Sequence, residues 1–223
     1  MIPLRRLTLI ALAAAVLTSA CARGLTPNET LAAKALFGDT LDTSEITVSA
    51  NLGLVPLPPE PPAPEGGAAT PTEPPKDLCV RKRSTKRSYQ SPAAFVLFND
   101  VYFNERFYTE DTFSGFPDSV PYPAALIMAH ELVHVWQWQN RAVTGYTPLV
   151  SAGESWEQVD PYFFNAAGRP EFLTYGYEQQ GAILQDFVCY ALFDSDSPRL
   201  GELAGILRPV LPVDGFLAEL GRR

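Results

Sequence analysis

The sequence predicts an α+β fold in one domain, in which a small mixed or antiparallel sheet precedes a set of helices. Short runs of β-branched and aromatic residues, which favour strands, lie in the first half of the chain. Two long apolar segments, 124–141 and 177–193, follow and are typical of buried helices. At 223 residues, of which 46% are hydrophobic, the chain is long enough for one domain with a core and short for two.

An export signal is predicted in residues 1–20. Two arginines precede an apolar run, 7–17, that is too short to span a bilayer as a mature helix. The run leads into Leu-Thr-Ser-Ala-Cys, which resembles a lipobox, so Cys21 is the predicted site of lipid attachment. Ordinary cleavage after Ala22 is the alternative. We therefore expect an exported lipoprotein on the periplasmic face of the outer membrane or, in the alternative, a soluble periplasmic or secreted protein.

The charges of the chain exclude one class of partner. The net charge is −8, and it becomes −10 when residues 1–20 and their two arginines are removed, so nucleic acid is not expected to bind. The basic run 81–83, with Lys86 and Arg87, could bind an anionic partner. Such runs are more often solvated loops, and a solvated loop is the preferred interpretation.

Two cysteines remain once Cys21 is assigned to lipid. The oxidising periplasm would let Cys79 and Cys189 form a disulfide. The alternative is a free thiol at Cys189, buried in the core.

Residues 25–54 are predicted to be folded. Thr26 and Glu29 form an S/T-x-x-E capping box with a proline between them, so a helix of about three turns is expected to start here and to end before Gly38. A short strand is predicted at 46–48.

Residues 55–78 are predicted to be a proline-rich disordered insertion, because nine prolines fall between positions 55 and 75. The piece before it is too small for a stable domain, so the insertion is assigned to a single domain, 21–223, and not to a linker.

The remaining elements follow from hydrophobic patterning and turn signals. The runs 95–98 and 101–103 flank an Asn-Asp turn and predict a hairpin or a kinked strand. Segment 124–141 predicts one helix without internal glycine or proline, and segment 177–193 predicts a helix that is apolar all round and therefore buried. One further short helix is expected in the tail after Arg199.

The sequence His130-Glu131-Leu132-Val133-His134 is an H-E-x-x-H motif inside the predicted helix 124–141. Residues four apart project from the same helix face, so both imidazoles can bind one metal ion, while Glu131 is offset and can hold a water. The chain has two histidines, and both stand in this motif. The pattern predicts a Zn²⁺ site with Glu131 as the base that takes a proton from the attacking water.

A catalytic zinc site needs a third protein ligand, and a further histidine is absent from the sequence. Glu178 is favoured because it opens the apolar helix, where burying an unpaired carboxylate is unfavourable and metal coordination would remove the penalty. A solvent-facing Glu178 that complements the helix dipole is the alternative interpretation. Among the other downstream carboxylates Glu154 and Asp186 come next, and the rest are Glu157, Asp160 and Glu171.

The stretch HELVHVWQ at 130–137, with EQQGAI at 178–183, resembles a group of small bacterial zincin-like proteins with H-E-x-x-H-V-x-Q and a later E-Q-Q-x-x-I segment. The resemblance covers most of residues 25 to 193, but the proline-rich insertion has no counterpart in the group. It implies a zincin-like fold with an active-site helix, and a gluzincin-type site with Glu178 on the following helix as third ligand. Ala182 stands where thermolysin-type sequences carry an aspartate, so the group that orients a ligand histidine is not assigned by the resemblance.

The sequence therefore predicts a zinc-dependent metallopeptidase, tethered in the bacterial cell envelope by a lipid anchor, that acts on a peptide or protein substrate there. Gln137 lies on the ligand face of the helix, where it could orient a ligand or bond a loop carbonyl. Candidates for stabilising the oxyanion are Tyr175, Tyr177 and Tyr146. The alternative is a catalytically silent binding or accessory lipoprotein, against which the intact Glu131 argues because a structural zinc site needs no base.

Overall fold

The computed structural model describes residues 22–50, 77–88, 91–168 and 170–221. The predicted leader, Cys21 and all but the last two positions of the stretch 55–78 lie outside these residues. The described part contains seven α-helices and one four-stranded sheet, so the α+β class is confirmed. None of the helices in this part is both long and apolar enough to cross a membrane.

The sheet is mixed, and it takes strands from both sides of residues 51–76. Its order is β1-β2-β4-β3, with β1 (Ala22–Gly24) antiparallel to β2 (Thr47–Ala50), β2 parallel to β4 (Asp100–Phe103), and β4 antiparallel to β3 (Ala94–Leu97). The hairpin prediction is confirmed by β3 and β4. The strand expected at 46–48 runs one to two residues later.

Strand β1 was not predicted, because Ala-Arg-Gly contains no β-branched or aromatic residue. The strand depends on pairing with β2 and on contacts of the Arg23 side chain. That side chain donates two hydrogen bonds, of 2.7 and 2.9 Å, to the carboxylate of Glu29.

Glu29 belongs to helix α2 (Pro27–Phe37), whose predicted start and end are confirmed, and it joins three segments. Its fully buried carboxylate closes the capping box with the amide of Thr26 at 2.9 Å and accepts bonds from the amide and hydroxyl of Thr112 at 2.9 and 2.8 Å. Burial opposes its charge, but Arg23 and these donors outweigh burial and lower its pKa. This contribution to stability is present at neutral pH and is lost as the pH falls through the lowered pKa.

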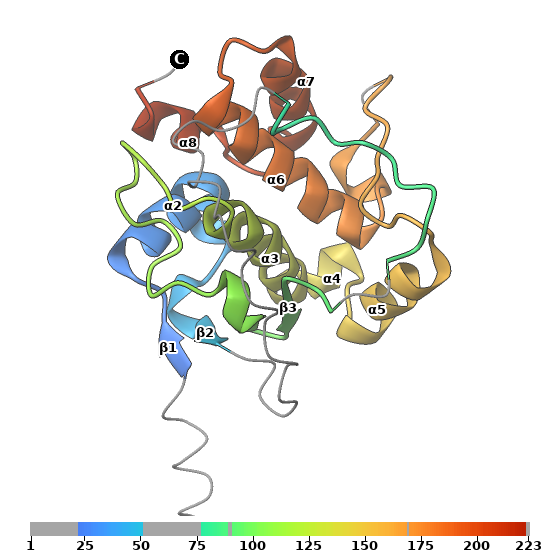
Figure 1. Ribbon diagram of the computed structural model, residues 1–223, viewed down its shortest axis with the longest axis horizontal. Helices are drawn as coiled ribbons and strands as arrows, with labels where there is room; N and C mark the ends of the chain where they lie inside the picture. Colours follow the sequence, from blue (N-terminus) through green and yellow to red (C-terminus); the bar gives the residue numbers. More distant parts are fainter. Residues whose placement is uncertain (1–21, 51–76, 89–90, 169, 222–223) are drawn as a thin grey trace, which may run out of the picture.

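Helix α3 (Ala124–Gln139) is the central element of the structure (Figure 1). It packs against β3 and β4 on one side and against α6 (Tyr177–Phe193) on the other. Because both sides are covered, every residue from 124 to 137 except Ile127 is buried. The two long predicted helices are confirmed, with α3 ending two residues before the expected limit.

The C-terminal tail differs from the prediction, because it holds two helices and not one. α7 (Pro198–Leu207) begins at Ser197, whose side chain accepts a hydrogen bond from the amide of Arg199, and it packs on α6. α8 (Asp214–Glu219) packs on α2, where Gly215 allows close approach: a Cβ at this position would lie 2.8 Å from the carbonyl oxygen of Ala35.

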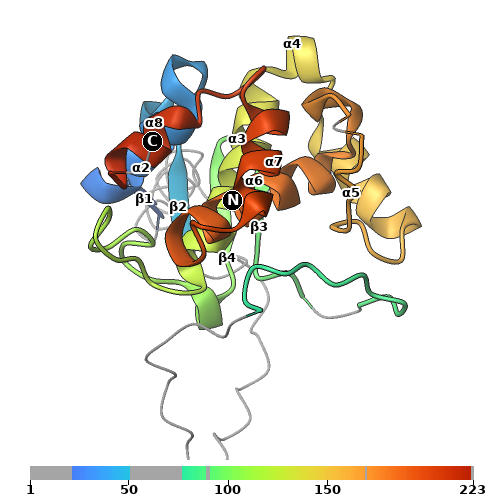
Figure 2. The same ribbon diagram turned by 90° about the horizontal axis from the view of Figure 1, so that it is seen from above.

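Helices α4 (Arg141–Thr144) and α5 (Pro148–Glu157) were also missed. α5 carries a recognisable start signal, since the Thr147 side chain caps it and proline follows, as at the start of α2. Figures 1 and 2 show α4 and α5 at the end of the α3–α6 pair opposite to α2 and α8. Glu178, in the first turn of α6, lies at the α5 end, where Ser151 of α5 contacts it.

Candidate metal centre

Both histidines lie on the side of α3 that faces α6, and a glycine lets the two helices meet there. A Cβ at Gly181 would lie 2.6 Å from two ring atoms of His130, which is closer than a real Cβ can come. The glycine is therefore required for the helix spacing, and this spacing brings the preceding turn of α6, which carries Glu178, within reach of the imidazoles.

The side chains of His130, His134 and Glu178 converge into a triangle of possible ligand atoms. The Nε2 atoms of the two histidines are 3.2 Å apart, and Glu178 Oε2 lies 3.2 Å from His130 Nε2 and 3.4 Å from His134 Nε2. The side chains are 6 to 13% exposed. Among the described residues this is the group of three that could hold a metal ion, and it contains all three predicted ligands.

Charge is distributed unevenly over this cluster. Burial disfavours a charged His134, but attraction to Glu178 and Glu131 and hydrogen bonds with Glu178 and Gln137 outweigh burial and raise its pKa to about 9. Burial also disfavours a charged Glu178, yet the two histidines outweigh it and hold the pKa of Glu178 well below its ordinary value. His130 has a lowered pKa, mainly because it is buried. A buried anion thus faces two imidazoles, which is the arrangement that a cation stabilises.

Glu131 lies beside the triangle and takes no part in it. The residue is 6% exposed, and its Oε2 is buried without a hydrogen-bond partner among the described residues. Burial raises its pKa to about 8, with attraction to His134 acting against the rise and repulsion from Glu178 adding to it. Such an oxygen calls for a donor, and a water in the site would supply one.

Two buried glutamine amides orient His134. Gln180 donates through Nε2 to the carbonyl oxygen of Tyr175 at 2.8 Å, and its Oε1 accepts from Gln137 Nε2 at 3.0 Å. Gln137 Nε2 also donates to the carbonyl oxygen of Tyr177 at 3.2 Å. Its Oε1 is thereby turned to His134 Nδ1, at 2.8 Å, and accepts the proton of that nitrogen, while Nε2 is the ring nitrogen that faces the triangle. Of the two roles predicted for Gln137, the contact with a ligand histidine is present, whereas the carbonyl that it bonds belongs to the first residue of α6 and not to a loop.

Helix α5 supports Glu178 from the other side. Ser151 donates to Glu178 Oε1 at 3.2 Å, which leaves Oε2 for the triangle. Glu154, a candidate third ligand in the sequence, instead accepts a hydrogen bond of 2.7 Å from the amide of Tyr177 at the start of α6. It stabilises the N-terminus of that helix and is not a ligand.

The other candidate ligands are engaged elsewhere or stand apart. Asp186 binds Arg81 through both carboxylate oxygens, and Asp160 accepts from the amide of Ser84 at 2.6 Å. Glu157 and Glu171 do not belong to the group that could hold a metal ion.

The two tyrosines predicted first for the oxyanion are directed away from the centre. Tyr175 donates to the carbonyl oxygen of Asn165 at 3.0 Å, and Tyr177 donates to that of Thr144 at 3.1 Å. Both hydroxyls are thus engaged with backbone carbonyls, since closeness in sequence to Glu178 does not fix side-chain direction at a helix start.

Two other tyrosines face the centre. The ring of Tyr146 lies 5.9 Å from that of His134, and its hydroxyl shares a hydrogen bond with Ser151. The ring of Tyr162 lies 5.6 Å from that of His130, and its hydroxyl has no hydrogen-bond partner in the described part of the chain. Burial, then repulsion by Glu178 and Glu131, raises the pKa of Tyr162 and keeps it protonated. The sequence around Tyr162 carries no local signal for this role.

The segment 77–88 runs beside α6 and is attached to it. Cys79 and Cys189 form a disulfide with a Cα–Cα distance of 5.6 Å, so Cys189 is not a free thiol. About one turn of α6 nearer to the metal centre, Arg81 pairs with Asp186 at 2.6 Å and is 21% exposed. The interpretation of the basic run as a solvated loop is therefore wrong for Arg81, although Lys82 is 77% exposed.

Comparison with known proteins adds no relative: the chain matches no protein-family model, no curated protein and no solved structure.

The orientation of His134 by Gln137 can be tested by substitution. Gln137→Ala removes the acceptor of the Nδ1 proton, so we expect metal affinity to fall by about 10- to 100-fold. Competition with a chromogenic chelator measures this. Gln139→Ala is the matched control, because that glutamine, on the same helix, bonds the backbone of Asp42. Equal metal affinities for the two variants would show that the hydrogen bond between Gln137 and His134 does not support metal binding.

Proposed function

We propose that this protein is a zinc-dependent metallopeptidase of the zincin type, with His130, His134 and Glu178 as ligands and Glu131 as base. The triangle of ligand atoms carries the proposal. Tetrahedral zinc with bonds of about 2.0 to 2.1 Å has ligand atoms about 3.3 to 3.4 Å apart. The three edges here are 3.2, 3.2 and 3.4 Å.

The types of ligand favour zinc over other divalent ions. Two imidazoles and one carboxylate form the ligand set of catalytic zinc sites, whereas magnesium and calcium prefer oxygen ligands alone. Three ligands leave a fourth tetrahedral position for water or substrate. The proton on His134 Nδ1, directed to Gln137 Oε1, supports the same assignment because it turns the Nε2 lone pair to the triangle.

Glu131 supports an enzyme over a structural site. When bound, zinc supplies a Lewis acid that polarises a carbonyl and makes a water more acidic. The unpartnered Oε2 of Glu131 accepts the proton of the attacking water and passes it to the leaving amine. A structural zinc site has no use for such a buried carboxylate.

Tyr162 is the proposed donor to the oxyanion. Its hydroxyl is protonated and free of other partners in the described residues, and its ring lies beside that of His130. Tyr162 is 39% exposed, so it also borders the solvent from which a substrate would enter. It takes the role predicted from sequence for Tyr175 and Tyr177.

We further propose that the protein is exported and anchored by lipid at Cys21. The lipobox-like sequence before Cys21 and the disulfide, which is typical of oxidising compartments, support this. Its substrates are accordingly peptides or proteins of the cell envelope.

The metal assignment predicts the zinc content of purified protein. We expect about one zinc per chain, little zinc in Glu178→Ala, and full occupancy in Glu171→Ala, which alters a carboxylate outside the triangle. Inductively coupled plasma mass spectrometry measures the content. Wild-type protein without zinc after growth in zinc-supplemented medium would disprove the assignment.

The catalytic assignment predicts a separation of binding from turnover. Glu131→Gln is expected to keep zinc and to lose turnover of a quenched-fluorescence peptide library. Tyr162→Phe is expected to lower kcat about 100-fold with little change in KM, since a donor to an oxyanion acts mainly in the transition state. Tyr175→Phe is the control. A Glu131→Gln protein that still hydrolyses the library would exclude this mechanism.

The export proposal predicts a change of cell fraction. In a Gram-negative bacterium, we expect the wild-type protein in the outer-membrane fraction with incorporated radiolabelled palmitate. Cys21→Ser removes the acylated thiol, so the variant is expected without label. Unlabelled wild-type protein in the soluble periplasm would instead support simple cleavage after the signal.

A further inference from the structure

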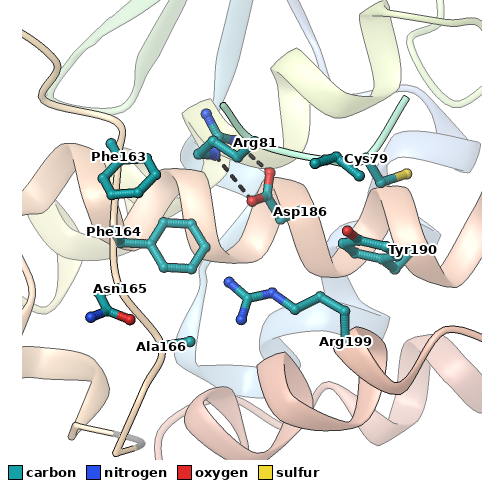
Figure 3. A pocket seen from close by; sticks show the side chains of 10 residues that line it. Cys79, Arg81, Phe163, Phe164, Asn165, Ala166, Asp186, Tyr190 and Arg199 are labelled. Carbon is teal, nitrogen blue, oxygen red and sulfur yellow. Dashed lines mark hydrogen bonds and ion pairs between the residues drawn. The ribbon is translucent and has the colours of Figure 1, made fainter. Parts of the chain in front are cut away.

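A pocket of about 280 Å³ lies against α6, the helix that also carries Glu178 (Figure 3). Helices α6 and α7, the segment 77–88 and the loop before α6 form its walls. Three aromatic side chains, Phe163, Phe164 and Tyr190, and two guanidinium groups line it. None of these side chains has a role in the proposed reaction.

The pocket has a surplus of positive charge. Arg81 donates to both oxygens of Asp186, through Nε at 3.0 Å and Nη2 at 2.6 Å, so this carboxylate is neutralised and its oxygens are occupied. The charge of Arg199 remains. It is shared with Glu202, an exposed residue of the same helix at 2.9 Å, on the solvent side. The surplus is notable in a chain with a net charge of −8.

The guanidinium of Arg199 has N–H groups that are available to donate hydrogen bonds to a ligand. It lies 5.5 Å from the centre of the Phe164 ring, and Figure 3 shows its side chain reaching across the pocket toward this ring. Its Nε and Nη2, together with Nη1 of Arg81, make no hydrogen bond to any described residue. Planar guanidinium groups with free donors bind carboxylates strongly, and an aromatic wall accepts the apolar part of the same ligand.

Two connections join the pocket to the metal centre. Tyr162 lies over His130, and the next residue, Phe163, lines the pocket. Arg81 Nη2 donates to the carbonyl oxygen of Ala182 at 3.4 Å, one residue from the glycine that packs on His130. Along α6, Glu178 and Asp186 are eight residues apart, which corresponds to about 12 Å. An extended peptide covers this distance in about three to four residues.

We propose that this pocket is a substrate subsite that binds a carboxylate about three to four residues from the bond held at the metal centre. The inference rests on the proposed peptidase function and names its substrate class: peptides with an acidic group at this spacing. The charged side chains that line the pocket, two guanidinium groups and one carboxylate, carry one net positive charge, which matches a carboxylate better than a phosphate dianion. The carboxylate belongs to a chain end or to an acidic side chain.

Binding of three peptides tests the subsite. Isothermal titration calorimetry is carried out on zinc-loaded Glu131→Gln protein, so that the peptides stay intact. The first peptide is acetyl-pentaalanyl-phenylalanine with a free carboxyl end, the second is its amide, and the third is the amide with glutamate in place of phenylalanine. We expect the first or the third to bind at least about tenfold more tightly than the second, since a charge-assisted hydrogen bond supplies such a factor. The first identifies a chain end, and the third identifies a side chain.

The ratio of the affinity for the tighter acidic peptide to the affinity for the amide peptide is expected to fall close to one in Arg199→Gln. Arg208→Gln, which alters an exposed arginine paired with Asp214, is the matched control and is expected to keep it. Glu202→Gln removes the competing partner of Arg199, and we expect the ratio to be kept or raised. Thermal unfolding of each variant verifies that it is folded.

Equal affinities for all three peptides, no detectable binding of either acidic peptide, or a ratio unchanged by Arg199→Gln overturns the subsite. Hydrolysis by wild-type protein is followed separately. A tenfold affinity ratio without hydrolysis supports the subsite and contradicts the peptidase proposal. Hydrolysis with equal affinities for the three peptides supports the peptidase proposal and contradicts the subsite.

Discussion

The close approach of α3 and α6 at Gly181 is the constraint on which the rest of the structure depends. The metal triangle takes two ligands from one helix and one from the other, so it exists only at this helix spacing. Groups around the pair maintain it: Ser151 and Glu154 of α5 hold the start of α6, the disulfide holds its later turns, and the sheet supports α3 from behind. Helix α5, the disulfide and the sheet therefore all support the contact between α3 and α6.

Much of this arrangement could be predicted because its signals are local. Four-residue spacing puts His130 and His134 on one helix face, and a continuous apolar pattern marks α6 to its first and last residue. The capping box at Thr26 defines α2 in the same way. Glu178 followed from an argument about burial, since a carboxylate at the start of an apolar helix needs a partner.

The parts that could not be predicted depend on contacts between distant segments. Tyr162 faces His130 while Tyr175 and Tyr177 are directed away, and nothing near these residues in the sequence distinguishes them. The two amides that orient His134 stand on different helices, so Gln180 gains its role only when α3 and α6 meet. Arg81 looked like part of a solvated basic run, yet its partner Asp186 lies 105 residues further along the chain.

The disulfide affects how the chain stays connected after its backbone is cut. It joins positions 110 residues apart, and His130, His134 and Glu178 all lie between them. These residues therefore belong to one covalent ring, whose closure restricts the unfolded chain more than a short loop would. A single backbone break anywhere within the ring leaves one covalently continuous molecule, with the three residues of the triangle still joined to each other. Such a ring keeps the three residues of the triangle in one molecule after a single proteolytic cut.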